Sequence, residues 1–266
     1  MSLAPVGIVG GAIGARDGEA ADILRGLLLR PAHTLQFDML PLTTHDWYFL
    51  SGFGGAAVML PIALAITFWL FYSFNARIAA LWVLLIGIAS VAVAATKVAF
   101  LGWGFGIREI DFTGVSGHTM LSTAVLPVMF YLVLLPAPRV LRGLGVLVGL
   151  TVGLLVGLSR LELLAHSVSE MIAGCVLGAL VALSLVLVLI RREPARAAPY
   201  RIAFSLIVLA VALHGLRAPT QHWVTQVALS LSGHEHPFIR ARWKANHSHE
   251  RTSTLDESGH AAHYGV

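Results

Sequence analysis

The sequence predicts an all-α fold, a polytopic membrane bundle of about six transmembrane helices. The chain of 266 residues is 57% hydrophobic and only 12% charged, whereas a soluble domain usually carries about 25% charged residues. Residues 47–76 contain no Asp, Glu, Lys, Arg or His. The apolar runs are continuous, without the alternation that the strands of a membrane barrel require. A water-soluble protein of this size could not bury so much apolar surface, so we expect an integral membrane protein.

The first three spans are the clearest. A helix needs roughly 20 predominantly apolar residues to cross the hydrocarbon core of a bilayer. The first candidate lies within residues 47–76, and the second covers residues 78–101, in which Lys97 is the single charge. The third covers residues 119–138 and carries no charge.

Three further spans follow. Residues 143–159 are uncharged and rich in glycine, and residues 171–190 are uncharged and strongly apolar. The sixth candidate, residues 202–216, is the shortest and contains His214. The alternation of spans and short loops predicts a helical bundle with no internal repeat.

The remaining segments divide the chain into three parts. We expect an N-terminal polar or amphipathic segment (1–46), a membrane helical domain (47–216) and a partly disordered C-terminal tail (217–266). The net charge is +4, but the cations lie in short loops between spans, where they set orientation. The sequence therefore predicts the lipid bilayer as a partner and no nucleic acid, and it does not indicate an oligomeric state.

Basic loops predict the orientation, because loops rich in Lys and Arg face the cytoplasm. The connections after the first, third and fifth spans carry arginines, the last of them against the single acid Glu193. The opposite face should be extracytoplasmic, and we expect the inner (plasma) membrane of a bacterium. Arg240 and two further cations in the tail, Arg242 and Lys244, fit poorly with a tail on that outer face.

Polar residues able to carry chemistry gather at the ends of four spans. They are Lys97 at the end of the second span, Ser116, Gly117 and His118 before the third, Arg160 after the fourth, and His166 and Glu170 at the start of the fifth. Since successive spans alternate in direction, all four ends lie on one side of the membrane. An ionisable residue at membrane depth costs on the order of 2.5–3.5 kcal/mol, so such residues usually have a function.

These residue types indicate phosphoryl transfer. Lys and Arg neutralise phosphate, and a serine with the amides of a helix N-terminus adds neutral donors. One histidine can attack phosphorus while the other protonates the departing oxygen. His166 and Glu170 are four residues apart and share a helix face, where a carboxylate can fix the tautomer of the ring.

Two segments resemble signatures of a known family. They read GVSGH (114–118) and SRLELLAHSVSE (159–170), and they are similar to the PSGH and SR-x5-H-x3-D signatures of the type 2 phosphatidic acid phosphatase and vanadium haloperoxidase superfamily. The resemblance implies a six-helix membrane phosphatase in which His166 forms a phosphohistidine, Glu170 orients it and His118 is the general acid. It further implies phosphate binding by Lys97, Arg160, Ser116 and the Gly117 amide, and hydrolysis without metal or cofactor.

The sequence departs from the family pattern at three places. Val115 replaces the proline of the second signature, and Glu170 replaces the aspartate of the third. The first signature, K-x6-R-P, fails after Lys97, because residues 104 and 105 are Gly and Phe. Arg108, eleven residues after Lys97, is our candidate for the missing guanidinium.

The expected function is hydrolysis of a lipid phosphate or diphosphate at the outer membrane face. A site at span ends meets headgroups while the spans meet lipid tails. The family resemblance suggests phosphatidic acid, phosphatidylglycerol phosphate or an isoprenyl diphosphate. The alternative is a non-hydrolytic lipid-phosphate binding or transport protein on the same fold, motivated by the incomplete first signature and by Glu170 in place of the family's aspartate. A phosphotransferase with an acceptor other than water would use the same residues.

Overall fold

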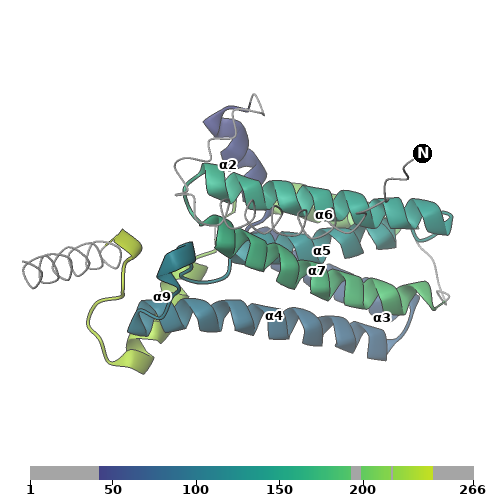
Figure 1. Ribbon diagram of the computed structural model, residues 1–266. Helices are drawn as coiled ribbons and strands as arrows, with labels where there is room; N and C mark the ends of the chain where they lie inside the picture. Colours follow the sequence, from purple (N-terminus) through teal and green to yellow (C-terminus); the bar gives the residue numbers. More distant parts are fainter. Residues whose placement is uncertain (1–41, 193–198, 217, 242–266) are drawn as a thin grey trace, which may run out of the picture.

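The computed structural model describes residues 42–192, 199–216 and 218–241 (Figure 1). Within these residues the chain is helical, and the only β-type pairing is an isolated bridge between Ile107 and Phe112. The all-α fold class is therefore confirmed. Most of the predicted N-terminal segment and the final part of the tail, where disorder was expected, lie outside the described residues.

The helices follow one another through short connections. In chain order they are α2 (Thr44–Phe53), α3 (Ala56–Ser73), α4 (Ala76–Trp103), the 3-10 helix η2 (Arg108–Ile110), α5 (Gly117–Val133), α6 (Arg139–Glu162), α7 (Val168–Ile190), α8 (Pro199–Leu213) and α9 (Thr220–Ser232). By length and composition four segments can cross a membrane: Thr44–Ser73, which joins α2 and α3, and the helices α4, α6 and α7. The chain is thus an integral membrane protein. The helices α5 and α8 are apolar but shorter, so the number of six spans stays a prediction.

The first predicted span is divided into two helices. A capping box starts α2, in which the Thr43 side chain accepts from the Asp46 amide and the Asp46 carboxylate accepts from the Thr43 amide. The helix ends at Phe53 with Gly54 as its C-cap, and Gly55 is the N-cap of α3. A pair of glycines is a common cause of a sharp helix break, and here it turns α2 out of line with α3, so that α2 lies beside α6 (Figure 1).

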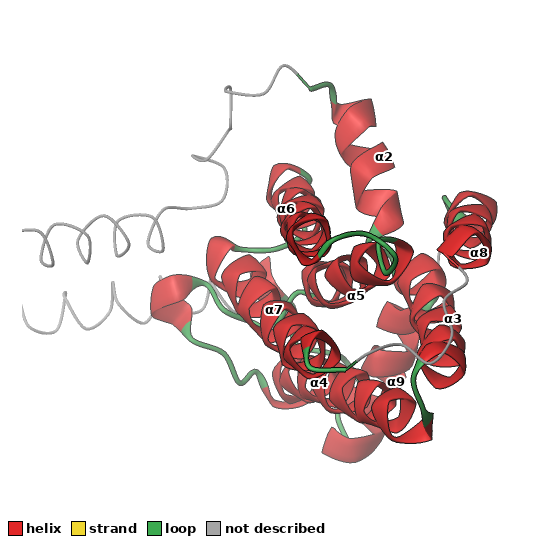
Figure 2. Cartoon of the chain, turned by 90° about the vertical axis from the view of Figure 1, so that its right-hand side faces the viewer, coloured by secondary structure: helices red, strands yellow, loops and turns green. Residues whose placement is uncertain are grey.

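The short helix α5 occupies the centre of the bundle. Viewed along the bundle, α5 lies among α3, α6, α7 and α8 (Figure 2). Most of its side chains are buried, including Met120, Ala124 and Val128, each at most 1% exposed. A helix in this position is covered by protein, so it does not need the length of one that faces lipid on its sides.

Glycines explain how closely the neighbouring helices approach α5. On α6, Gly149 lies so close to α5 that a Cβ there would come within 2.5 Å of the Pro127 backbone. A Cβ at Gly153, one turn later, would come within 2.8 Å of Thr123 Cα. On α7, a Cβ at Gly174 would lie 2.8 Å from the Ser116 carbonyl oxygen, and one at Gly178 would lie 2.5 Å from that of Met120. Small residues of this kind let membrane helices pack backbone to backbone. They place the start of α5, the end of α6 and the start of α7 together.

Candidate active site

The centre of the site is a histidine and a carboxylate at the start of α7. Ser167 is the N-cap, and Glu170 closes a capping box by accepting from the Ser167 amide at 3.2 Å. The same carboxylate oxygen, Oε2, lies 2.7 Å from Nδ1 of His166. Because an ionised carboxylate only accepts hydrogen bonds, Nδ1 carries the proton, and Nε2 is left with its lone pair. This geometry leaves a nucleophilic nitrogen available.

The other oxygen of Glu170 is held by groups from distant segments. Oε1 accepts from the Thr113 amide at 2.7 Å, from the Thr113 hydroxyl at 2.6 Å, and from Nη2 of Arg240. The Glu170 side chain is fully buried. Buried charges of this kind are stable only when paired and hydrogen-bonded, and here both oxygens meet donors.

Two cations face the pair from other helices. Lys97 lies near the end of α4, and Gly114, with φ +148°, packs so tightly on it that a Cβ would come within 3.2 Å of Lys97 Cγ. Arg160 lies in the last turn of α6 and donates from Nη1 to the Ser51 hydroxyl at 2.8 Å. Within the described residues, Nε of Arg160 is buried and has no hydrogen-bond partner. A buried donor without a partner calls for a ligand or water, so Arg160 is well suited to bind an anion.

The start of α5 joins the second signature to the third. Ser116 is its N-cap and is fully buried, and its amide donates to the backbone carbonyl of Glu170 at 3.2 Å. That amide is thus engaged by the protein, whereas the Gly117 amide stands at the N-terminus of the helix, where orphan N–H groups favour an anion. His118 follows in the first turn, and the α2–α3 break covers it: a Cβ at Gly54 would lie 3.4 Å from His118 Cβ.

The charges in this cluster act on one another. His118 and His166 interact electrostatically, and both feel Lys97 and Arg160. Burial lowers the pKa of His166 below its ordinary value of 6.5. The hydrogen bond and negative charge of Glu170 raise it, and the two cations lower it further. The depressed pKa keeps the ring neutral at pH 7, which is the form that can attack phosphorus.

The structure thus brings together the polar residues at the span ends, namely Lys97, Ser116, Gly117, His118, Arg160, His166 and Glu170. Arg108 is different, because it lies in the 3-10 helix η2 and its side chain is exposed. Its role in phosphate binding stays a prediction. Three contacting residues were not predicted: Ser51, Thr113 and Arg240. For Arg240 the signal was present, because a basic tail on the outer face conflicted with the orientation rule.

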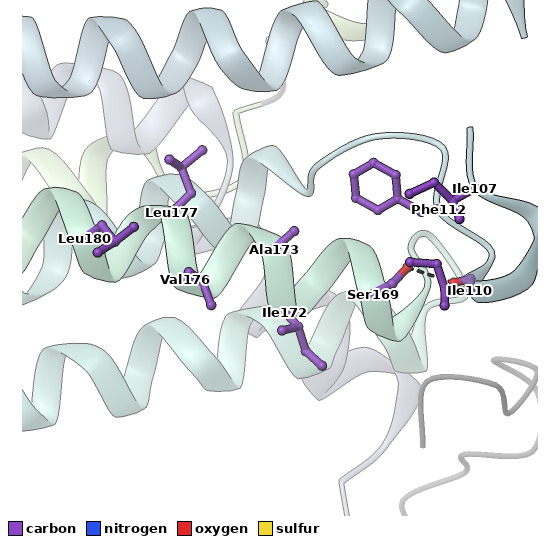
Figure 3. Close-up of a pocket in the computed structure, with 9 residues that line it drawn as sticks. All are labelled: Ile107, Ile110, Phe112, Ser169, Ile172, Ala173, Val176, Leu177 and Leu180. Atoms are coloured by element: carbon purple, nitrogen blue, oxygen red, sulfur yellow. Dashed lines mark hydrogen bonds between the residues drawn. The ribbon is translucent and has the colours of Figure 1, made fainter. Parts of the chain in front are cut away.

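An apolar groove runs along α7 from the same end of the bundle (Figure 3). Its volume is about 470 Å³. The lining residues come from α7 and from the loop before α5: Ile107, Ile110, Phe112, Ser169, Ile172, Ala173, Val176, Leu177 and Leu180. The Ser169 hydroxyl donates to the Ile110 carbonyl at 2.8 Å, which links the start of α7 to the loop before α5 at one end of the groove. An acyl or isoprenoid chain has the apolar character that this groove matches.

No cluster of three or more His, Cys, Asp or Glu side chains able to hold a metal ion occurs in the part of the chain that the structure describes. Of the tail histidines, His234 donates from Nδ1 to the Gly102 carbonyl at 2.7 Å, the tautomer assigned from this contact. The independence of the reaction from metal stays a prediction.

Comparison with known proteins indicates the family of the chain. Residues 102–194 match the model of the PAP2 superfamily. The chain is 40% identical over 201 residues to the "Uncharacterized 22.5 kDa protein in cps region" of Klebsiella pneumoniae, covering 96% of that protein and 73% of this chain. It is also similar to the crystal structure of a transmembrane PAP2-type phosphatidylglycerolphosphate phosphatase from Bacillus subtilis, with 20% identity, a TM-score of 0.46, and coverage of 70% of this chain and 91% of that one. The residues that match the family model include both signatures and the helices α5, α6 and α7 that carry them, and the chain therefore belongs to the PAP2 superfamily.

Proposed function

We propose that the chain is a membrane phosphatase that hydrolyses a lipid phosphate or diphosphate at the extracytoplasmic face, through a phosphohistidine on His166. The observation that carries the proposal is the 2.7 Å contact between His166 Nδ1 and Glu170 Oε2. It leaves Nε2 as the nucleophile among cations that can hold a phosphate. Membership of the PAP2 superfamily supports the phosphatase activity.

The chemistry follows in two steps. Nε2 of His166 forms a bond to phosphorus while the bond from phosphorus to the leaving oxygen breaks, and His118 donates a proton to that oxygen. Neutral His118 then takes a proton from water, whose oxygen displaces His166 and releases inorganic phosphate. Lys97, Arg160 and the Gly117 amide would hold the phosphoryl oxygens, on which charge accumulates in each transition state. No step uses a metal or cofactor.

A lipid substrate is supported by the setting of the site. The catalytic groups lie at the ends of helices whose sides are apolar, and the groove on α7 starts beside them. A headgroup in the cluster would leave its hydrocarbon chain at the level of this groove. Burial of each methylene contributes about 0.8 kcal/mol, so a groove of this kind favours a long-chain phosphate over a soluble one.

Phosphate release from a panel of lipid phosphates tests the proposal. The panel contains phosphatidic acid, phosphatidylglycerol phosphate and an isoprenyl diphosphate, each given to the purified full-length chain in mixed micelles. We expect release from at least one lipid, loss of release in His166→Ala, and wild-type release in His222→Ala, an exposed histidine on α9. Rapid acid-free quenching with labelled substrate should trap a phosphorylated chain that is absent in His166→Ala.

Three outcomes would contradict parts of the proposal. Release that persists in His166→Ala would exclude that residue as the nucleophile. Binding of the lipids without release from any of them would favour the non-hydrolytic alternative. Transfer of label to an added alcohol in place of water would identify a phosphotransferase.

A further inference from the structure

The C-terminal segment reaches into the site through one arginine, which neither the motifs nor the family match includes. Nη2 of Arg240 donates to Glu170 Oε1, and it also donates to the Thr113 hydroxyl at 2.7 Å. Since that hydroxyl in turn donates to Oε1 at 2.6 Å, the three groups form a closed triangle. On its other edge, Nε of Arg240 lies 3.7 Å from Asp111 Oδ1.

The path of the chain places this arginine. The helix α9 packs on the C-terminal end of α4 (Figure 1), where a Cβ at Gly102 would lie 3.2 Å from the Ala228 carbonyl oxygen. Gly233 ends α9 in the left-handed conformation, with φ +71°. We call the following residues, 233–240, the C-terminal strap.

Contacts with the end of α4 hold the strap. The Phe238 amide donates to the Leu101 carbonyl at 2.9 Å. The Phe238 ring lies over Gly104, where a Cβ would come within 2.9 Å of it and where φ is +72°. With the His234 contact to Gly102 at 2.7 Å, these anchors bring Arg240 to Glu170 from outside the helices that carry the signatures.

The charge balance of the site gives Arg240 its effect. When His166 is neutral, Glu170 is a fully buried anion, and a buried charge without a partner is strongly destabilising. A guanidinium stays protonated under all conditions in which proteins function, so Arg240 compensates the carboxylate while the ring next to it is uncharged. Its side chain is 28% exposed, at the edge of the site and on the side of Glu170 away from His166.

We propose that Arg240 is a positioning residue for the phosphatase reaction: it holds Glu170 ionised with Oε2 directed at His166, so that the C-terminal strap completes the active site. This inference rests on the proposed function for its kinetic consequences. Arg240 acts through the carboxylate, whereas Lys97 and Arg160 are the cations placed to act on phosphate.

The pH dependence follows from the groups that face His166. These are Glu170 from α7, Lys97 from α4, Arg160 from α6 and His118 from α5. Removal of Arg240 leaves the negative charge of Glu170 less compensated, which stabilises the protonated ring of His166. The titration of His166 should therefore move to higher pH, and the acid limb of kcat should move with it.

The test uses the full chain in detergent micelles with Arg240→Met, Arg240→Lys and Arg192→Met, an exposed arginine at the far end of α7. We expect Arg240→Met to lower kcat by about 10-fold and to change KM by less than about twofold. Loss of a group that orients a functional side chain typically lowers activity by about 10- to 100-fold, and the expected effect is at the lower end of that range. Arg240→Lys should recover part of kcat, and Arg192→Met should match the wild type. Phe238→Ala, which releases the strap without removing the guanidinium, should lower kcat in the same direction.

A second measurement does not depend on turnover. The Cε1–H resonance of His166, identified by its loss in His166→Ala, is titrated by NMR in the wild type and in Arg240→Met. A midpoint that moves to higher pH in the variant supports the inference, and an unchanged midpoint overturns it whatever the phosphate assay shows. A raised KM with unchanged kcat would also overturn it, because that result identifies a phosphate ligand. Absence of phosphate release by the wild type would contradict the proposed function. The NMR titration would then still decide whether Arg240 acts on His166 through Glu170.

Discussion

Exchange of Glu170 for glutamine tests the roles of its two oxygens separately. Oε1 receives donors from Thr113 and Arg240, whereas Oε2 receives them from His166 and Ser167. A glutamine side chain ends in one carbonyl oxygen and one NH₂ group, and the three donor contacts at the Oε1 position outweigh the two at the Oε2 position. We therefore expect the oxygen to take the Oε1 position, which turns the NH₂ group toward His166.

This orientation inverts the tautomer of His166. An NH₂ group at 2.7 Å from Nδ1 can only donate, so Nδ1 must accept and the proton must move to Nε2, which then has no lone pair for phosphorus. A histidine locked in the wrong tautomer by an acid-to-amide exchange costs a hydrolase about 10⁴-fold in kcat. We expect a loss of about 10³- to 10⁴-fold in Glu170→Gln at nearly unchanged substrate binding, because the phosphate-binding cations are untouched.

The effect is measured as the single-turnover rate of phosphate release by Glu170→Gln relative to the wild type. The melting temperatures of the two proteins are compared first, to show that the variant folds normally. His222→Ala serves as the control for substitution away from the site. A Glu170→Gln variant that folds normally and keeps more than a tenth of the wild-type rate would refute the tautomer argument. It would show that His166 does not need a carboxylate on Nδ1.

Three further predictions concern pH, packing and the groove. Since burial lowers the pKa of His166 below 6.5, kcat/KM should keep its value as the pH falls through 6.5 and decline only below it; a decline centred above 6.5 would contradict this. Gly149→Ala should lower the melting temperature, because its Cβ would meet the Pro127 backbone at 2.5 Å and overpacking costs typically about 1–3 kcal/mol. Gly143→Ala is the matched control, because a Cβ there would meet nothing within 4 Å. Equal melting temperatures of the two variants would contradict the close packing of α6 on α5. Ala173→Trp should raise KM about 10-fold for a long-chain lipid phosphate and leave a short-chain one unchanged, and an equal effect on both would remove the groove from substrate binding.

The fold class could be predicted because the bilayer leaves few solutions. Continuous apolar runs without alternation allow only helices, and the second, fourth and fifth spans correspond to α4, α6 and α7. The break at Gly54 and Gly55 was not predicted, because residues 47–76 are uncharged throughout, which predicts one continuous span. The central place of α5 was also not evident, since it depends on glycines of α6 and α7 that meet it across the bundle.

The site was accessible to sequence reasoning only where spacing determines contact. His166 and Glu170 are neighbours on any helix start, and the alternation of spans brings Lys97 and Arg160 to the same side. Thr113 and Arg240 reach Glu170 across 57 and 70 residues of chain respectively. No periodicity connects such residues, so their contacts follow from tertiary packing alone.

Glu170, which replaces the aspartate of the third signature, is also the residue that Arg240 of the C-terminal strap contacts. An aspartate at position 170 would withdraw the carboxylate by one carbon–carbon bond, about 1.5 Å. The contacts to His166 at 2.7 Å and to Thr113 at 2.6 Å would then exceed hydrogen-bond length unless the backbone moved. The longer glutamate reaches both His166 on one side and the loop before α5 on the other, and this second side is where Arg240 arrives. Glutamate at this position and an arginine supplied by the tail therefore fit each other: the extra methylene brings Oε1 within reach of Thr113 and Arg240, and the guanidinium compensates the charge of the buried carboxylate.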